Sequence, residues 1–212
     1  MNKDKVSKIF ETFQKQNPEP KTELNFTSDY TLLVAIVLSA QTTDIAVNKA
    51  TKELFKVAST PQKMVKLGEE KLKTYIKTIG LFNSKAKNVI LLSQKLIDGH
   101  NSKVPDVFEK LIPLPGVGTK TANVFLNCFY HKPVIAVDTH VLRVSNRIGL
   151  VKTKTADETA AKLMKVVPNE YKLHAHHWLI LHGRYTCKAR KPECNNCTIE
   201  KLCSFKGKQG LS

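Results

Sequence analysis

Apolar residues recur at helical spacing along almost the whole chain. The first helical face collects four of them, Val6, Ile9, Phe10 and Phe13. The segment from Tyr30 to Ser39 is apolar nearly all round, as expected of a helix in the middle of a fold. The same period predicts helices over 46–54, 64–67, 72–76, 86–96, 107–111, 119–130, 139–146, 156–166 and 173–182. Strand signals are weak, so the sequence predicts an all-α protein with roughly ten helices.

Prolines and glycines interrupt this helical pattern, but no segment of the sequence has the composition of a linker. Pro113 and Pro115 end the short helix at 107–111, and Pro133 ends the helix at 119–130. We expect two helical domains: a barrel-like block over 22–132, and a second domain built from 1–21 plus 133–212. The first contains two helices joined by a hairpin at about 107–130.

Composition indicates a packed chain that carries a large positive charge. Hydrophobic residues make up 42%, which is too many for a disordered chain. The 34 Lys and Arg against 18 Asp and Glu give a net charge of +16, which favours a nucleic-acid partner. The alternative is a basic proteome in which lysine is simply the usual surface residue. With no bilayer-length apolar run and no signal or transit peptide, we expect a soluble monomer in the cytoplasm, associated with the nucleoid and not with a membrane.

The hairpin has features of a phosphate-binding turn. In Leu114-Pro115-Gly116-Val117-Gly118, the two glycines permit close approach of another molecule, and the next helix begins with outward amides. Leu114 and Val117 are expected to lock the hairpin between its helices. The alternative is an ordinary glycine-rich turn, but in so basic a chain the pattern favours DNA binding. The segment resembles the helix-hairpin-helix of the DNA glycosylase superfamily, in which a later aspartate follows the hairpin.

That resemblance directs attention to Lys120 and Asp138. Lys120 lies in the first turn of the helix after the hairpin, where the helix dipole disfavours the cation and so favours the nucleophilic neutral amine. Asp138 stands between the apolar Val134 to Val137 and a helix, where it is suited to be an N-cap, a catalytic carboxylate, or both. An amine attacking the anomeric carbon beside a carboxylate would release a base and form a Schiff base, from which the 3′ phosphate is eliminated. The alternative for Lys120 is a surface lysine.

Four of the five cysteines are clustered near the C-terminus. Cys187, Cys194, Cys197 and Cys203 follow the pattern C-x6-C-x2-C-x5-C, which suits four thiolate ligands for zinc or for an iron-sulfur cluster. Zinc sites more often have two C-x-x-C pairs, and this chain has one. Between the first two cysteines lie Lys188, Arg190 and Lys191, a basic loop that either contacts phosphates or is merely solvated.

The cysteine spacing resembles that of the endonuclease III and adenine-glycosylase families. The resemblance to endonuclease III extends over nearly the whole chain, through the segments 38–44, 75–81, 136–140 and 177–184. It implies one 4Fe-4S cluster, and a glycosylase and abasic-site lyase acting on duplex DNA with damaged pyrimidines or abasic sites. It also implies that Gln41 fills the gap left by an extruded base, and that Leu81, together with Ile79, wedges the other strand.

Two related families fit less well. Adenine glycosylases lack the hairpin lysine, carry a catalytic glutamate before the Gln-Thr motif, and have an extra C-terminal domain. Here Lys120 is present, no carboxylate lies between Tyr30 and Asp44, and the chain ends nine residues after Cys203. The 8-oxoguanine glycosylases share the lysine and aspartate but lack the cluster. Two alternatives of another kind remain: a protein that binds DNA without cutting it, and a zinc-stabilised DNA-binding protein.

Overall fold

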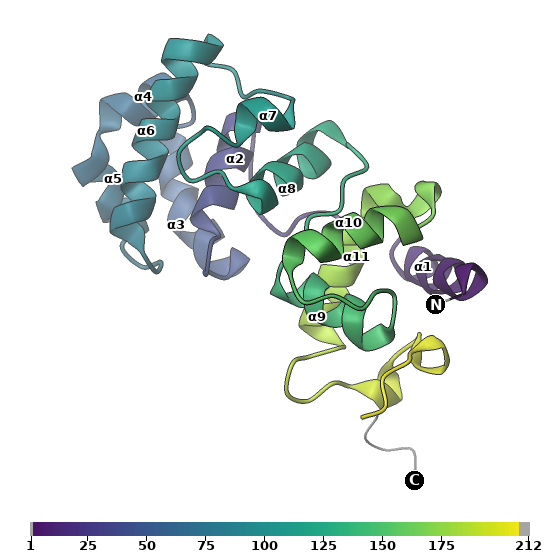
Figure 1. Ribbon diagram of the computed structural model, residues 1–212. Helices are drawn as coiled ribbons and strands as arrows, with labels where there is room; N and C mark the ends of the chain where they lie inside the picture. Colours follow the sequence, from purple (N-terminus) through teal and green to yellow (C-terminus); the bar gives the residue numbers. More distant parts are fainter. Residues whose placement is uncertain (1, 208–212) are drawn as a thin grey trace. The chain divides into compact units, whose positions relative to one another are not determined.

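The computed structural model describes residues 2–207, which form eleven α-helices, three 3₁₀-helices and no strand (Figure 1). The predicted all-α class is confirmed. None of the described helices is both long and apolar enough to cross a bilayer. The α-helices are α1 Lys3–Gln16, α2 Asp29–Leu38, α3 Asp44–Val57, α4 Pro61–Leu67, α5 Glu69–Ile76, α6 Phe82–His100, α7 Phe108–Leu111, α8 Thr119–Tyr130, α9 Thr139–Ile148, α10 Ala156–Val166 and α11 Lys172–Tyr185. The 3₁₀-helices are η1 Asn169–Tyr171, η2 Cys194–Asn196 and η3 Glu200–Leu202.

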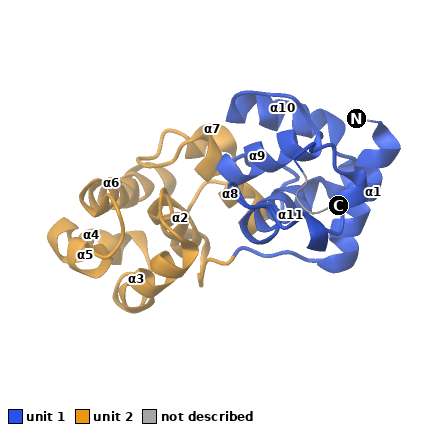
Figure 2. Ribbon diagram, turned by 90° about the horizontal axis from the view of Figure 1, so that it is seen from below, with its two compact units in different colours: residues 1–22, 131–212 blue, residues 23–130 orange. Residues whose placement is uncertain are grey.

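The chain forms two compact units (Figure 2). We call Glu23–Tyr130 the central unit, and Met1–Thr22 with His131–Ser212 the terminal unit. The boundaries expected at 22 and 132 lie one and two residues from those of the central unit. Each unit has its own helices and its own buried residues, and each is described separately below.

Helix α2 is the buried helix of the central unit. Every residue from Tyr30 to Leu38 is buried, and α2 contacts α3, α6 and α8. Its start is fixed by a capping box, in which Ser28 Oγ accepts from Thr31 N while Thr31 Oγ1 accepts from Ser28 N. Inside, the Tyr30 hydroxyl pairs with Ser93 Oγ of α6 at 2.6 Å, which satisfies a polar group that would otherwise be buried alone. The nearly uniform apolar pattern of this segment follows from burial on all sides.

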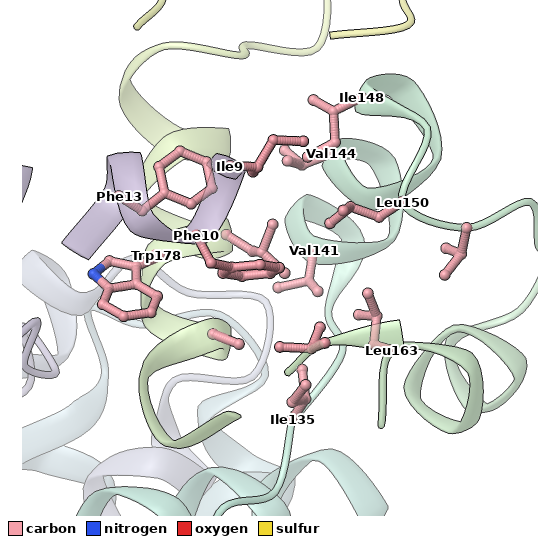
Figure 3. Close-up of a cluster of buried hydrophobic side chains, with 14 of the residues drawn as sticks. Ile9, Phe10, Phe13, Ile135, Val141, Val144, Ile148, Leu150, Leu163 and Trp178 are labelled. Carbon is pink, nitrogen blue, oxygen red and sulfur yellow. The ribbon is translucent and has the colours of Figure 1, made fainter. Parts of the chain in front are cut away.

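In the core of the terminal unit, α1 packs against α9 and α11, which lie far from it in the sequence. Figure 3 shows Ile9 and Phe10 of α1 directed at residues of α9 and α11. The residues that they face include Val141 and Val144 of α9 and Trp178 of α11. Trp178 Nε1 also donates to Asn17 O at 2.8 Å, so that the end of α1 is tied to α11 by a hydrogen bond as well as by apolar contact. Helices α9 and α11 pack closely at Gly183, where a Cβ would come within 3.0 Å of Val144 Cγ2.

Three histidines of α11 are buried and contact other parts of the terminal unit. His176, His177 and His182 are buried, and His176 Nδ1 lies 2.8 Å from Ala136 O. His182 packs on the ring of Phe13, with centroids 5.2 Å apart. These contacts give His176 a hydrogen bond and His182 a packing partner inside the terminal unit.

The burial of His177 predicts a pH-dependent stability. Burial, with His176 nearby, lowers the pKa of His177 to about 3, below its unfolded value near 6.5. The unfolded chain therefore binds the extra proton first, and stability falls as pH drops below about 6.5. Between pH 7.5 and 5.5 this one group is expected to cost about 1 kcal/mol, or about 2–4 °C in melting temperature. His177→Gln should reduce that pH slope in thermal melts, and His131→Asn at an exposed site should leave it unchanged.

Candidate active site and cysteine pocket

The predicted hairpin forms between α7 and α8 in the central unit. Leu114 N donates to Leu111 O and Val117 N donates to Leu114 O, both at 3.0 Å, so two tight turns reverse the chain. Leu114 and Val117 are 3% and 5% exposed, so both side chains are buried, as residues that lock the hairpin between its helices would be. Their side chains are not available to DNA, so only the backbone here and the exposed glycines are free to face a phosphate.

The two hairpin glycines have different physical roles. Gly116 has φ of +78°, and a Cβ there would lie 3.0 Å from Val37 Cγ1 and 3.2 Å from Asn88 Cβ. Glycine is therefore needed at position 116 both for the left-handed backbone and for the close packing of the hairpin against α2 and α6. Gly118 has an ordinary φ, and a Cβ would meet nothing within 4 Å. Its carbonyl accepts from Ala122 N at 3.0 Å, at the start of α8.

This difference predicts unequal effects of alanine. Gly116→Ala combines a strained φ with a tight contact, and we expect it to lower the free energy of unfolding by about 1–3 kcal/mol. Gly118→Ala has room and a permitted backbone, so it should be neutral or stabilise by up to about 1 kcal/mol. Thermal melts of the two variants beside wild type measure the difference. Equal melting temperatures for both would contradict the close packing of Gly116.

Lys120 is the second residue of α8 and its side chain is exposed. It lies two residues after Gly118, at the same helix start whose free amides follow the hairpin. A chain that folds this way presents the amine beside a helix N-terminus, where anions are favoured. Lys120 thus belongs to the central unit, together with the hairpin.

Asp138 belongs to the terminal unit, where it is the N-cap of α9. Its Oδ1 accepts from Val141 N at 2.8 Å, and Leu142 N donates to Asp138 O at 2.8 Å. The cap interpretation is therefore correct. The cap bond also fixes the orientation of the carboxylate, and it uses Oδ1 while Oδ2 has no hydrogen bond among the described residues.

Gln41 and Leu81 lie in two exposed turns of the central unit. Both adopt a left-handed backbone, with φ of 53° and 58°. Leu81 is 59% exposed, although it is a large apolar residue. Ile79 is only 3% exposed, and this burial does not support the expectation that its side chain enters the DNA stack beside Leu81.

The C-terminal cysteines are arranged by a run of tight turns. Cys197 N donates to Cys194 O, Glu200 N to Cys197 O, and Cys203 N to Glu200 O, at 3.0–3.1 Å. Each bond joins residues three apart, and side chains three apart in such turns lie on the same side. Cys187, at the end of α11, is held separately by its N–H to His182 O at 2.7 Å.

All four of these cysteines line one pocket. Burial, together with a smaller contribution from the other three cysteines, raises the pKa of the Cys197 thiol to about 11. Thiolates gathered in one pocket repel one another, so a cationic group that compensates their charge favours them. Among residues 2–207 no three His, Cys, Asp or Glu side chains are gathered to hold a single metal ion. Cys128 lies apart on α8, where burial raises its thiol pKa to about 12.

Arg147 of α9 organises the pocket and the basic loop. Its Nη1 donates to Lys188 O at 2.7 Å and lies 3.5 Å from Cys187 Sγ, and its Nη2 donates to Ala189 O at 3.0 Å. The guanidinium stacks on Phe205 at 4.8 Å. The loop is closed by Glu193 N donating to Thr186 O at 2.9 Å.

Within this loop the three predicted basic residues are all exposed. Lys188 pairs with Glu193 on the surface, whereas the side chains of Arg190 and Lys191 form no ion pair with the described residues. Exposed pairs of this kind contribute little, so Lys188 is easily released to another anion.

Sequence reasoning missed Arg147 and Lys85. Arg147 follows Arg143 by one helical turn, and both arginines donate to backbone carbonyls of the segment that leads into the cysteines. Lys85 is buried on the apolar side of α6, four residues before the buried Val89. A lysine in an apolar helical stripe is a detectable signal, because burying it requires a partner.

The chain is similar to known DNA repair proteins in both sequence and fold. The family model described as the HhH-GPD superfamily base excision DNA repair protein matches residues 34–169. The chain is 58% identical to endonuclease III of Rickettsia conorii, over 94% of this chain and 95% of that protein. It is 55% identical to endonuclease III of Escherichia coli K12, over 98% and 99%. A solved structure of a trapped endonuclease III–DNA covalent intermediate has a TM-score of 0.91 and 41% identity, covering 96% of each chain.

Proposed function

The chain belongs to the HhH-GPD superfamily of base excision DNA repair proteins, and within it to the endonuclease III family, and we propose that it is a bifunctional DNA glycosylase and abasic-site lyase. Its substrate is duplex DNA that contains oxidised pyrimidines or abasic sites, which would bring the protein to the nucleoid. The observation that carries the proposal is an exposed lysine at the helix start directly behind a glycine hairpin. A protein that only binds DNA has no need of an amine there.

Lys120 is the proposed nucleophile. Its neutral Nζ attacks C1′ of the sugar, the bond to the base breaks, and the base departs with the bonding electrons and gains a proton. The ring opens to a Schiff base between Nζ and C1′. Loss of a C2′ proton then expels the 3′ phosphate by breaking the C3′–O bond, and water finally hydrolyses the Schiff base to free the lysine.

Asp138 is the proposed partner carboxylate. Positive charge develops on the sugar as the base leaves, and a fixed carboxylate stabilises that charge. The same group is suited to accept a proton from the attacking amine. The cap bond to Val141 N supports this role, because the orientation is set before substrate binds and costs no ordering at the moment of reaction.

One 4Fe-4S cluster is the proposed cofactor. The four cysteines fit it in number and chemistry, since they line one pocket, where a compensating cation favours their thiolates. The spacing of the four cysteines, with one C-x-x-C pair and not two, favours a cluster over one zinc ion. When bound, the cluster supplies a rigid cross-link of the C-terminal segment. Arg147 would offset its negative charge, and Phe205 N already donates to Cys203 Sγ at 3.4 Å.

DNA contacts are proposed at three places. The hairpin amides around Gly116 and Gly118 bind a phosphate. Gln41 fills the gap left by the extruded base, and Leu81 wedges the opposite strand, a role that explains its exposure. The loop with Lys188, Arg190 and Lys191 contributes electrostatic attraction to the backbone.

A panel of duplexes, each with one lesion, tests the function. Purified protein should release oxidised pyrimidines and nick the strand, and it should leave undamaged duplex and 8-oxoguanine opposite cytosine largely intact. Borohydride added during the reaction should trap a covalent adduct. Binding without base release would identify a DNA-binding protein only. If the protein is colourless, free of iron and loaded with zinc after anaerobic purification, the four cysteines form a zinc site and the proposal of a cluster is wrong.

A further inference from the structure

Lys85 is a buried lysine in the first turn of α6. It is 5% exposed, and burial lowers the pKa of its ammonium group. A buried amine needs a hydrogen-bond acceptor to offset its lost hydration. Its Nζ donates to Thr42 Oγ1 at 2.8 Å, across 43 positions of the chain. The bond therefore connects α6 to the turn that follows α2, within the central unit.

The same residue supports the turn of Leu81. Lys85 N donates to Leu81 O at 3.0 Å, and Ser84 Oγ donates to that carbonyl at 3.0 Å. Leu81 is held with φ of 58°, which is unfavourable for leucine and persists only when neighbours over-determine it. The main chain of Lys85 is therefore part of the wedge turn.

The side chain of Lys85 reaches the turn of Gln41. Thr42 N donates to Ser39 O at 3.0 Å, which closes the turn around Gln41, and Gln41 also has a left-handed backbone with φ of 53°. Thr42 stands next to Gln41 in the chain and is the residue that Lys85 Nζ contacts. One residue thus contacts both strained turns, by its main chain at one and its ammonium group at the other.

We propose that Lys85 is a positioning residue that fixes the spacing between Gln41 and Leu81, so that both are ready to enter the DNA stack when a base is extruded. This inference rests on the proposed function, because the two turns need a fixed spacing only if they act on one opened base pair. Opening the stack costs several kcal/mol for any enzyme that extrudes a base. Turns that are already ordered do not add their own ordering cost to that step.

The contacts of Lys85 favour this role over a purely structural one. A buried helix position does not need an ammonium group for stability. An apolar side chain at the same position would pack without the loss of hydration that an ammonium group suffers. The acceptor it contacts, Thr42, is a part-buried residue of the turn between α2 and α3 and does not belong to the hydrophobic core. The expected loss on removing the bond is therefore in base extrusion and not in folding.

The test uses full-length protein with two variants that break the bond from opposite sides. Lys85→Met keeps the length of the side chain without a donor, and Thr42→Val keeps the shape of the acceptor without its oxygen. Lys87→Met, at an exposed position of the same helix, controls for the loss of one positive charge. Substrates are a duplex with one oxidised pyrimidine beside 2-aminopurine, and a single-stranded oligonucleotide with an abasic site, which has no stack to open.

On the duplex, both variants should lower kcat/KM for base release by about tenfold or more, the size of one lost charged hydrogen bond. The 2-aminopurine fluorescence rise that reports unstacking should fall in parallel. Nicking of the single strand should stay within about twofold of wild type, and the double variant should be no worse than Lys85→Met alone. Lys87→Met should match wild type on both substrates.

Three results would overturn the inference. They are unchanged duplex activity in both variants, an equal loss on duplex and single strand, and losses that add in the double variant. If Lys85→Met fails to fold, Thr42→Val alone decides, because it alters a turn outside the hydrophobic core. Failure of the proposed function has a different signature, in which wild-type protein itself neither nicks abasic DNA nor forms a borohydride adduct.

Discussion

Lys120→Ala is expected to abolish the borohydride-trapped adduct and to lower strand nicking at abasic sites by about a thousandfold or more. The variant removes the only atom proposed to bond with C1′, and no neighbouring group in the mechanism replaces it. The measurement is single-turnover nicking of an abasic duplex, with the adduct scored on a denaturing gel. Folding should not change, because the side chain is exposed and alanine is the best helix former at the second position of α8.

Two further variants separate chemistry from binding. Lys120→Arg keeps a positive charge beside the hairpin but supplies no nucleophilic amine, so it should bind abasic duplex within about tenfold of wild type and form no adduct. Lys71→Ala removes an exposed lysine from α5 of the same unit, and it should nick normally. Full adduct formation by Lys120→Ala would show that another amine is the nucleophile, and the lyase mechanism given above would be wrong.

Much of the fold was predictable because the helices are patterned by burial. The segment that became α2 was apolar all round because it is enclosed, and α1 carried one apolar face because only that face meets α9 and α11. Helix ends were also readable, since Pro133 ends α8 and Asp138 caps α9. The cysteine cluster was readable because cysteines three and six apart are brought together by local turns, which need no knowledge of the rest of the fold.

The remaining features depend on contacts between distant parts of the chain. Lys85 and Thr42 are 43 positions apart, and no local pattern specifies that they meet. Arg147 reaches the carbonyl groups of Lys188 and Ala189 only because α9 packs beside α11. The family resemblance implied that Ile79 wedges the DNA beside Leu81, yet the side chain of Ile79 is buried. Side-chain direction in an irregular segment is set by tertiary packing, which the sequence leaves open.

Cys194→Ser is expected to remove the iron and to lower the melting temperature by about 10 °C or more. The segment from Cys187 to Cys203 contains only two three-residue 3₁₀-helices, and few of its residues are buried apart from Cys187 and Ile199. So little core cannot order it, and binding of the proposed cluster would contribute to its folding free energy. A loss of about 3–5 kcal/mol corresponds to that shift, at about 2–4 °C for each kcal/mol in a chain of this size.

The matched control is Cys128→Ser, which replaces a cysteine of α8 outside the pocket. It should keep the iron, the visible absorption of the cluster and the activity, and lose about 1 kcal/mol from burying a hydroxyl. Cys194→Ser should also become sensitive to proteolysis between 187 and 207, while the central unit stays resistant, because the two units have separate cores. If Cys194→Ser retains full iron and an unchanged melting temperature, the pocket is not the cofactor site. If instead Cys128→Ser loses the iron, the ligand set must include α8, which the tight turns joining Cys194, Cys197 and Cys203 argue against.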